Sequence, residues 1–142
     1  MTQLSIVIPA HNEAGNLAPL IAEITSVFAA EAPRLDYEIV IIDDGSGDGT
    51  RAEVSALMPG EPRLRLIAHG QRAGKSAALK TGFEAARGAW IAMLDGDGQN
   101  DPADLAQLWP EIAGGGEEVI YAGVRRRRND GAVKWATSKL AN

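Results

Sequence analysis

Short apolar runs alternate with helix-length segments along almost the whole of this sequence. Five runs are rich in aliphatic or β-branched residues, as expected of strands that are buried on both faces: Leu4 to Ile8, Tyr37 to Ile42, Leu64 to Ala68, Trp90 to Leu94 and Val119 to Ala122. The segments between them have helical spacing or helix-start signals: Ala14 to Ala30, Gly49 to Leu57, Ser76 to Arg87 and Pro102 to Ala113. We expect Asn12 to be the N-cap of the first of these helices. The alternation predicts an α/β fold in which a parallel sheet is flanked by helices and joined by right-handed crossovers.

The length and composition limit the number of domains and the kinds of metal site. With 142 residues, 45% of them hydrophobic, the chain is long enough for one packed core and short for two, so we expect a single domain over residues 1–142. The sequence contains no cysteine, which excludes disulfides and thiolate metal sites. A metal must therefore be held by oxygen or imidazole ligands, which favours hard cations.

The net charge of −5 argues against general nucleic-acid binding, although residues Arg125 to Arg128 form a basic run. Part of this run is expected to be a solvated basic face, close to an anionic membrane surface. No stretch approaches the roughly 20 apolar residues needed to cross a bilayer, and Met1 leads into a strand-like run without a basic leader. The sequence as given therefore predicts a cytoplasmic protein.

Four polar segments follow the predicted strands: 9–15, 43–49, 69–76 and 95–101. In open parallel sheets, ligands bind beyond the carboxyl ends of the strands. We therefore expect these four loops to meet at one rim of the sheet and to form the functional site.

The strongest chemical signal is the sequence Asp95-Gly96-Asp97-Gly98-Gln99. Two carboxylates separated by a glycine can turn toward one point, and Gln99 can add a carbonyl oxygen. Mg²⁺ takes one or two carboxylates and completes its shell with water and substrate phosphate, so this sparse set suits a metal bound to a diphosphate. The plainer interpretation is a solvated turn that precedes the next helix, with Asp101 as the cap of that helix. A calcium loop of the EF-hand type is excluded, because the glycine and glutamate positions and a preceding helix are missing.

The second loop, Asp43-Asp44-Gly45-Ser46, changes abruptly from apolar to acidic. A carboxylate there is placed to accept hydrogen bonds from a base or a ribose. The alternative is that Asp44 and Ser46 only stabilise a turn, while Ser46 or Asp48 caps the following helix.

The third loop, Gly70-Gln71-Arg72-Ala73-Gly74-Lys75-Ser76, lies where a phosphate-binding P-loop belongs. It has three residues between its glycines where the P-loop requires four, and His69 stands where the first glycine should be. Lys75 and Arg72 remain candidates for contact with phosphate or base, with ordinary surface charge as the alternative.

Taken together, these residues resemble glycosyltransferase family 2, which has the GT-A fold, and within it the polyprenyl-phosphate branch that includes dolichyl-phosphate mannose synthases. The resemblance covers nearly the whole chain. It rests on the order and spacing of these elements: 8–13 (IPAHNE), 42–46 (IDDGS) with 48–50 (DGT), 74–78 (GKSAA), 95–99 (DGDGQ) with 101–102 (DP), and 123–125 (GVR).

The resemblance implies a role for individual residues. Pro9, Ala10, Asn12 and Glu13 would line the nucleoside pocket, Asp43 would contact the base, and Asp95 would lie near the ribose or the metal. Asp97 and Gln99 would ligate Mg²⁺ or Mn²⁺ with Asp95, and Lys75 would contact the substrate. Arg125 matches an arginine that such enzymes direct at phosphate and would act in catalysis with Asp97, and Lys134 or Lys139 would do similar work.

The resemblance also implies an inverting transfer of a hexose from a nucleotide-diphosphate sugar, such as GDP-mannose or a UDP-sugar, to a polyprenyl phosphate at the cytoplasmic face of a membrane. Such an acceptor is already ionised and needs no general base, whereas a saccharide hydroxyl would need one. Asp101 and Asp104 are near the right loop but fit a helix start equally well.

Two function classes compete with this transferase. One is a P-loop kinase or nucleotide hydrolase, and the other is a non-catalytic nucleotide-sugar-binding module. For the transferase, a homo-oligomer is a further option. Because the family normally continues with further sheet and acceptor-facing elements, the chain looks truncated at its C-terminus. We therefore expect donor binding to survive better than turnover.

Overall fold

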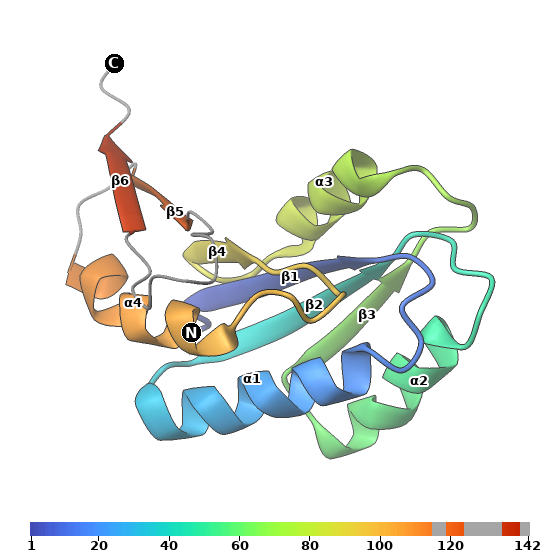
Figure 1. The fold of residues 1–142 in the computed structure, drawn as a ribbon, viewed down its shortest axis with the longest axis horizontal. Helices are drawn as coiled ribbons and strands as arrows, with labels where there is room; N and C mark the ends of the chain where they lie inside the picture. Colours follow the sequence, from blue (N-terminus) through green and yellow to red (C-terminus); the bar gives the residue numbers. More distant parts are fainter. Residues whose placement is uncertain (115–118, 124–134, 140–142) are drawn as a thin grey trace, which may run out of the picture.

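The computed structural model describes residues 1–114, 119–123 and 135–139. Helices and strands alternate as the sequence predicts up to the last helix (Figure 1). The elements are β1 (Leu4–Ala10), α1 (Leu17–Glu31), β2 (Tyr37–Asp43), α2 (Thr50–Leu57), the short 3₁₀ helix η1 (Met58–Gly60), β3 (Leu64–Ala68), α3 (Lys75–Ala85), β4 (Trp90–Met93), α4 (Pro102–Gly114), β5 (Val119–Gly123) and β6 (Trp135–Lys139).

The first four strands form one parallel sheet in the order β3-β2-β1-β4. β1 lies in the centre, paired with β2 from Leu4↔Tyr37 to Ala10↔Asp43 and with β4 from Leu4↔Trp90 to Val7↔Met93. All four strands run in the same direction, so the loops that follow them meet at one edge, as the sequence predicts. The mostly parallel sheet flanked by helices confirms the predicted α/β fold.

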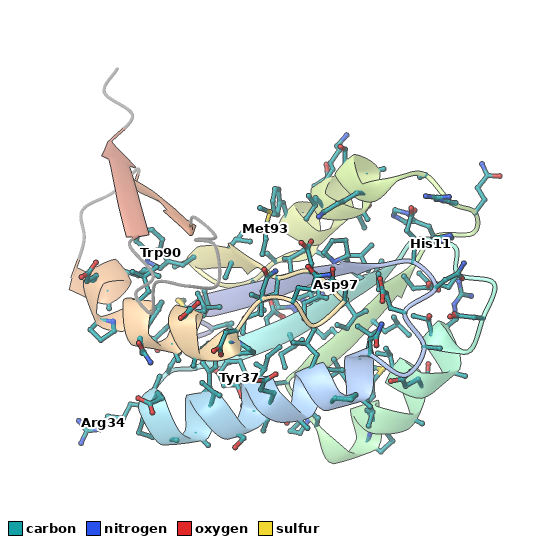
Figure 2. All side chains as sticks on the ribbon, viewed as in Figure 1. His11, Arg34, Tyr37, Trp90, Met93 and Asp97 are labelled. Atoms are coloured by element: carbon teal, nitrogen blue, oxygen red, sulfur yellow. The ribbon has the colours of Figure 1, made fainter. Side chains whose placement is uncertain are left out.

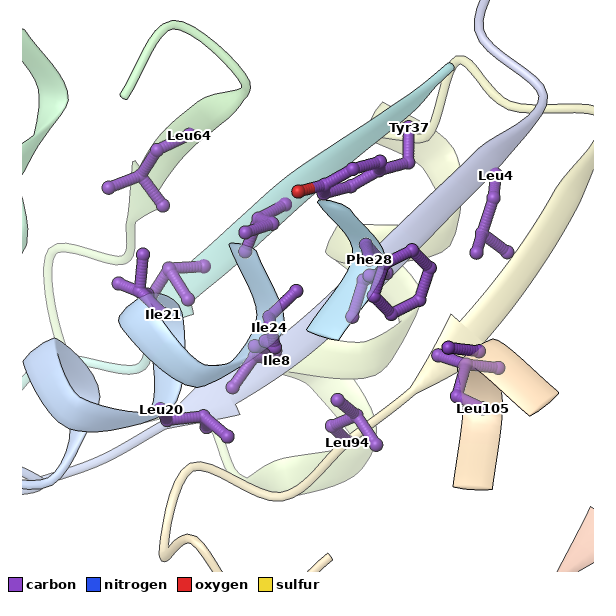
Figure 3. Close-up of a cluster of buried hydrophobic side chains, with 14 of the residues drawn as sticks. Leu4, Ile8, Leu20, Ile21, Ile24, Phe28, Tyr37, Leu64, Leu94 and Leu105 are labelled. Atoms are coloured by element: carbon purple, nitrogen blue, oxygen red, sulfur yellow. The ribbon is translucent and has the colours of Figure 1, made fainter. Parts of the chain in front are cut away.

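Helices cover both faces of the sheet (Figure 1). On one face, apolar side chains of α1 and α4 pack against alternate residues of the central strands, such as Ile6 and Ile8 of β1 (Figure 3). On the other face, α3 packs on Val7, Val40 and Ile42 through Ala78. This division follows from the strand period of two, which sends neighbouring side chains to opposite faces. The central strands are therefore apolar on both sides.

α3 approaches the sheet closely at Gly82, which is buried. A Cβ at this position would lie 2.3 Å from Cγ1 of Val7. Glycine therefore sets the distance between α3 and β1.

A buried polar cluster lies at the other end of the strands, away from the loops that follow them. The carboxylate of Glu38 accepts hydrogen bonds from Ser5 Oγ at 2.7 Å, from Arg65 Nη1 at 2.7 Å and from the backbone N–H of Arg87 at 2.7 Å. Ser5 Oγ accepts a further bond of 2.8 Å from the N–H of Gly88. Burial alone would raise the pKa of Glu38, but the hydrogen bonds outweigh it and hold the pKa below its ordinary value of 4.5. The cluster ties the connection between α3 and β4 to β1 and β2.

Two expectations about the elements are wrong. Asn12 does not cap the first helix, because α1 begins at Leu17 with Asn16 as its N-cap residue, and Asn12 has a left-handed backbone with φ 54°. The fifth apolar run does not join the parallel sheet, since β5 pairs antiparallel with β6 in a separate two-stranded sheet. An apolar run indicates a strand but carries no information about its partner. The other cap is confirmed: Asp101 Oδ1 accepts a hydrogen bond from the N–H of Ala103 at the start of α4.

β4 is an edge of the four-stranded sheet, and its side chains are the least covered. Ile91 is 43% exposed and Met93 55% exposed, on the face where α3 covers β1 and β2. Phe83 of α3 is also exposed. Among the described helices, none is both long enough and apolar enough to cross a membrane.

Candidate functional site

A cavity of about 250 Å³ lies at the loop edge of the sheet. Its lining comes from the end of β1, the loops after β1, β2, β3 and β4, and the start of α3. The lining residues are Pro9, Ala10, His11, Glu13, Asp44, Arg72, Lys75, Ala78, Asp95, Gly96 and Asp97. Figure 2 shows where His11 and Asp97 lie on the ribbon. The structure therefore brings together in one hollow the four segments that the sequence places at the rim.

The loop after β1 is fastened to the loop after β2 by reciprocal hydrogen bonds. The N–H of Asn12 donates to Ser46 Oγ at 3.0 Å, while Oδ1 of Asn12 accepts from the N–H of Gly47 at 2.9 Å. The N–H of Glu13 donates to Thr50 Oγ1 at 2.9 Å. Because Asn12 uses its side chain in this way, it positions the loop and is absent from the cavity lining.

The start of α1 is capped by a residue of α2. Glu53 accepts hydrogen bonds from the N–H of Gly15 at 2.6 Å and from the N–H of Ala18 at 2.8 Å. Asn16, the N-cap residue of α1, makes no side-chain capping bond. The first N–H groups of a helix lack partners inside the helix. Glu53 supplies the acceptor oxygens that Asn16 does not.

Asp44 organises the loop after β3. Its two carboxylate oxygens accept hydrogen bonds of 2.8 Å from the N–H groups of Ala73 and Gly74, and Nδ1 of His69 lies 2.8 Å from Oδ1. The other ring nitrogen of His69 lies 2.9 Å from Thr81 Oγ1 on α3. Burial alone would raise the pKa of Asp44, but these hydrogen bonds outweigh it and lower the pKa from its ordinary value of 3.8.

This arrangement argues against a P-loop. A P-loop presents its backbone N–H groups to phosphate, whereas the N–H groups of Ala73 and Gly74 are already bound to an internal carboxylate. The loop also packs directly on Gly45, where a Cβ would lie 2.4 Å from the backbone nitrogen of Arg72. The fold of this loop therefore depends on Asp44 and Gly45.

Asp43 faces away from the cavity. Its side chain is fully buried, where Oδ1 accepts a bond of 3.1 Å from the N–H of Ser46 and Oδ2 pairs with Arg51 Nε at 3.0 Å. Burial alone would raise its pKa, but these contacts outweigh it and lower the pKa from 3.8. Asp44, and not Asp43, is the acidic residue of this pair that lines the cavity.

The acidic loop after β4 faces the cavity through both aspartates. Asp95 Oδ1 lies 2.5 Å from Lys75 Nζ, and the two side chains are 42% and 62% exposed. Asp97 Oδ1 accepts a hydrogen bond of 3.0 Å from the N–H of Gln99. Gly98 has φ 72°, which favours glycine, and a Cβ at Gly96 would lie 3.3 Å from Pro9 O. Both glycines thus serve the turn that presents the two carboxylates.

The donor set suits a hard cation that shares its ligands with a substrate. Asp95 and Asp97 line one cavity, and two carboxylates are what Mg²⁺ commonly takes from a protein. Over the described part of the chain there is no group of three or more His, Cys, Asp or Glu residues that could hold a metal ion. Oxygens from water and a phosphate ligand would therefore have to complete the coordination.

The predicted site residues divide into three groups. Those that line the cavity together are Pro9, Ala10, Glu13, Lys75, Asp95 and Asp97. Asn12, Asp43 and Gln99 lie in the same loops but outside the lining. The basic run from Arg125, with Lys134, lies outside the described residues, as does the side chain of Lys139.

Sequence reasoning missed four residues that shape the site. His11 lines the cavity, with Nδ1 2.8 Å from the carbonyl oxygen of Asp44. His69, Thr50 and Glu53 hold the loops in place. The partners of the last two lie 35 to 38 residues away in the sequence, so no local pattern marks them.

Comparison with known proteins agrees with the order of these loops. A profile of glycosyl transferase family 2 matches residues 5–141. The chain belongs to glycosyltransferase family 2. This family membership confirms the resemblance seen in the sequence.

Two curated relatives are similar to this chain over most of its length. The chain is 33% identical over 130 residues to dodecaprenyl-phosphate galacturonate synthase of Rhizobium johnstonii, a match that covers 91% of this chain and 38% of that protein. It is 34% identical over 123 residues to dolichol-phosphate mannosyltransferase of Mycosarcoma maydis, covering 85% of this chain and 41% of that protein. The matched region is thus about two fifths of each relative.

A solved mannosyltransferase structure has a similar fold. The mannosyltransferase of Pyrobaculum calidifontis, in complex with GDP-mannose and Mn²⁺, superposes with a TM-score of 0.73 at 27% identity, covering 89% of this chain and 36% of the other. The GT-A fold predicted from the sequence is confirmed.

Proposed function

We propose that this chain binds a nucleotide-diphosphate sugar in the rim cavity and forms the donor-binding part of an inverting glycosyltransferase whose acceptor is a polyprenyl phosphate. The observation that carries the proposal is that one cavity brings together three groups of residues: Pro9, Ala10, His11 and Glu13; the basic residues Arg72 and Lys75; and the carboxylates Asp95 and Asp97. The first group suits a nucleoside, and the others suit a diphosphate with its cation.

The charges of the cavity explain why a cation is needed. Among the described residues, four carboxylates (Glu13, Asp44, Asp95 and Asp97) and two cationic side chains (Arg72 and Lys75) line it, a net charge of −2. A diphosphate would be repelled by this surplus unless another positive charge accompanied it. When bound by Asp95 and Asp97, Mg²⁺ or Mn²⁺ supplies that charge and stabilises the departing nucleoside diphosphate. Gln99 and, beyond the described residues, Arg125 are the further candidates for contact with metal and phosphate.

The transfer itself is a single displacement. An oxygen of the acceptor phosphate forms a bond to the anomeric carbon of the sugar, and the bond from that carbon to the donor diphosphate breaks on the opposite face. The electron pair leaves with the nucleoside diphosphate, whose growing negative charge Lys75 and Arg72 are placed to stabilise. A phosphate acceptor is already ionised, so no residue of this chain has to remove a proton.

The acceptor places the reaction at a membrane surface. The names of the two curated relatives refer to polyprenyl phosphates, a dodecaprenyl phosphate in one and a dolichol phosphate in the other. We assign the same acceptor class to the proposed transferase, with transfer to a saccharide as the nearest variant.

Calorimetry tests the donor site. We expect binding of GDP-mannose or a UDP-sugar that is strengthened by Mn²⁺, and no comparable binding of ATP. The variant with Asp95→Asn and Asp97→Asn should bind the nucleotide sugar no better with Mn²⁺ than without it, with circular dichroism as the check on its fold. If the double variant retains the Mn²⁺ effect, the metal assignment is wrong.

Substitution of Lys75 separates this function from a P-loop enzyme. A kinase or hydrolase would lose ATP-dependent phosphoryl transfer with Lys75→Ala and be little affected by Asp97→Ala. The proposed transferase predicts loss of Mn²⁺-assisted donor binding with Asp97→Ala.

Transfer of radiolabelled sugar to a short polyprenyl phosphate separates a transferase from a binding module. We expect the 142 residues to bind donor with little turnover, and full activity of this chain alone would contradict that expectation.

A further inference from the structure

Lys75 and Asp95 form an ion pair inside the proposed donor site. Nζ of Lys75 lies 2.5 Å from Oδ1 of Asp95, and both side chains line the cavity with Asp97. We propose that Lys75 is an exchangeable counter-ion, which occupies Asp95 when the cavity holds no ligand and moves to the donor diphosphate when a divalent cation takes its place. The proposal rests on the donor and metal roles assigned above and adds that this lysine couples the two binding events.

The backbone of Lys75 is fixed, so the exchange involves only its side chain. The preceding residues Ala73 and Gly74 donate to the buried carboxylate of Asp44. Lys75 is also the first residue of α3, which packs on the sheet through Ala78. The long side chain of lysine can therefore swing from Asp95 to a neighbouring anion while the loop keeps its shape.

The ion pair competes with a cation. A cation coordinated by Asp95 would stand close to the ammonium group, and two positive charges at that separation repel each other. Because the pair is half-exposed, it is weak enough to be displaced. A metal that arrives alone must therefore displace Lys75 and leave it without an anionic partner.

The donor diphosphate changes this balance. The oxygens of the diphosphate give the ammonium group of Lys75 another anionic partner in the same cavity. When a cation displaces Lys75 from Asp95, the ammonium group therefore stays paired and does not move into solvent. Binding of the cation and of the nucleotide then favour each other, and by linkage each must raise the affinity of the other by the same factor. Lys75 accordingly suppresses binding of free metal and permits binding of metal with nucleotide.

The test measures Mn²⁺ binding without any catalytic readout. Electron paramagnetic resonance of free Mn²⁺ gives the affinity of the chain for Mn²⁺ alone and in the presence of saturating GDP or UDP. In Lys75→Met we expect the affinity for Mn²⁺ alone to rise by up to about fivefold, the range that loss of an exposed ion pair allows. We expect its affinity for GDP or UDP with Mn²⁺ to fall, so that the coupling factor between metal and nucleotide becomes smaller.

Two variants control for charge. Arg72→Met removes a positive charge from the same cavity, and Lys80→Met removes one from α3, where Lys80 pairs with Glu84. Neither Arg72 nor Lys80 forms a hydrogen bond or ion pair with Asp95, whose partner is Lys75, so both variants should raise the affinity for Mn²⁺ alone less than Lys75→Met does.

The outcomes separate the exchange from the function on which it rests. If the unmodified chain shows Mn²⁺-dependent nucleotide binding but Lys75→Met leaves the affinity for Mn²⁺ alone unchanged or lowers it, the exchange is wrong and the donor site stands. An equal rise in all three variants also overturns the exchange, because it would reflect net charge alone. If the unmodified chain binds no Mn²⁺ with either nucleotide, the proposed function and the exchange both fail.

Discussion

Glu53 on α2 accepts a hydrogen bond of 2.8 Å from the backbone N–H of Ala18 in the first turn of α1. The same carboxylate accepts a second bond from the N–H of Gly15, just before the helix. Helix α1 is therefore capped by a side chain of α2. This contact also fixes the loop that carries Glu13 into the cavity.

Replacing Glu53 should destabilise the chain through α1. We expect Glu53→Ala to lower the free energy of unfolding by about 1–2 kcal/mol, the usual loss for a helix cap. Urea denaturation followed by circular dichroism measures the change. Glu53→Gln keeps one acceptor oxygen and should lose less. Glu23→Ala, at an exposed position of α1, is the matched control, and an equal loss there would show that the cap is unimportant.

Asp44→Asn should disturb the proposed donor site, because it changes the acceptor that holds the loop after β3. An amide presents an N–H₂ group to one of the two N–H donors, Ala73 or Gly74, where the carboxylate presents oxygen. We expect a loss of about 1–3 kcal/mol in stability, as for a buried hydrogen bond broken on one side. The affinity for the nucleotide sugar should fall as well, because Lys75 follows this loop.

Urea denaturation and calorimetry measure the two effects of Asp44→Asn. Ser55→Ala, at an exposed position of α2, is the control and should change neither quantity. Unchanged stability of Asp44→Asn would contradict the anchoring role.

Gly82→Ala should destabilise the chain, although alanine is the better helix former. An exposed helix would gain up to about 1 kcal/mol from this change. Here the new Cβ would meet Cγ1 of Val7 at 2.3 Å, and we expect a loss of about 1–3 kcal/mol from overpacking. Thermal or urea unfolding measures it.

A smaller side chain at Val7 of β1 should offset the stability that Gly82→Ala loses. The double variant Val7→Ala with Gly82→Ala should be more stable than the sum of the single changes predicts. Gly60→Ala is the control, because nothing lies within 4 Å of the new Cβ there. Strict additivity of the two changes would mean that the contact does not limit the packing.

Stability should depend on pH through Glu38. Its pKa is lower in the folded chain than the ordinary value of 4.5, so its stabilising contribution is complete above that pH and is lost as the pH falls through the folded pKa. We expect Glu38→Gln to cost about 1.5–3 kcal/mol near neutral pH, as for hydrogen bonds to a charged group. The difference from the unmodified chain should shrink on acidification below pH 4.5.

Comparison of the two proteins at each pH removes the contribution of Asp43 and Asp44, whose pKa values are also lowered. Ser55→Ala, at an exposed position of α2, changes no titratable group and should show a constant difference across the same range. A difference for Glu38→Gln that grows at low pH would contradict the direction of the shift.

The sheet was predictable because its strands are apolar on both faces. Each of the first four apolar runs became a strand, and the loops after them met at one edge. The place of Asp95 and Asp97 in the cavity lining was also predictable, since both residues closely follow a strand of the parallel sheet.

The sequence could not predict which face of the sheet each of the two carboxylates at the end of β2 would take. A strand that is buried on both sides has no polar alternation to indicate which residue points where. In the structure Asp43 turns to the side of α2, where it meets Arg51, and Asp44 turns to the side of α3. One residue of register decides which aspartate reaches the cavity.

The contacts that hold the loops were not predictable either. Asn12 precedes an apolar helix and has the usual character of a cap, but its side chain bonds to Gly47 across 35 residues. Local rules assign such residues to the nearest helix, because the competing partner exists only after the strands have paired.

The outer edge of β4 is a place where a further strand can extend the sheet. Its backbone lies at the margin of the sheet, beside the uncovered side chains of Ile91 and Met93 and a few residues before Asp95. A strand added there would arrive next to the mouth of the cavity without touching the fastened loops after β1 and β2. The sheet can thus be extended beside the cavity while the loops that line it keep their hydrogen bonds to one another.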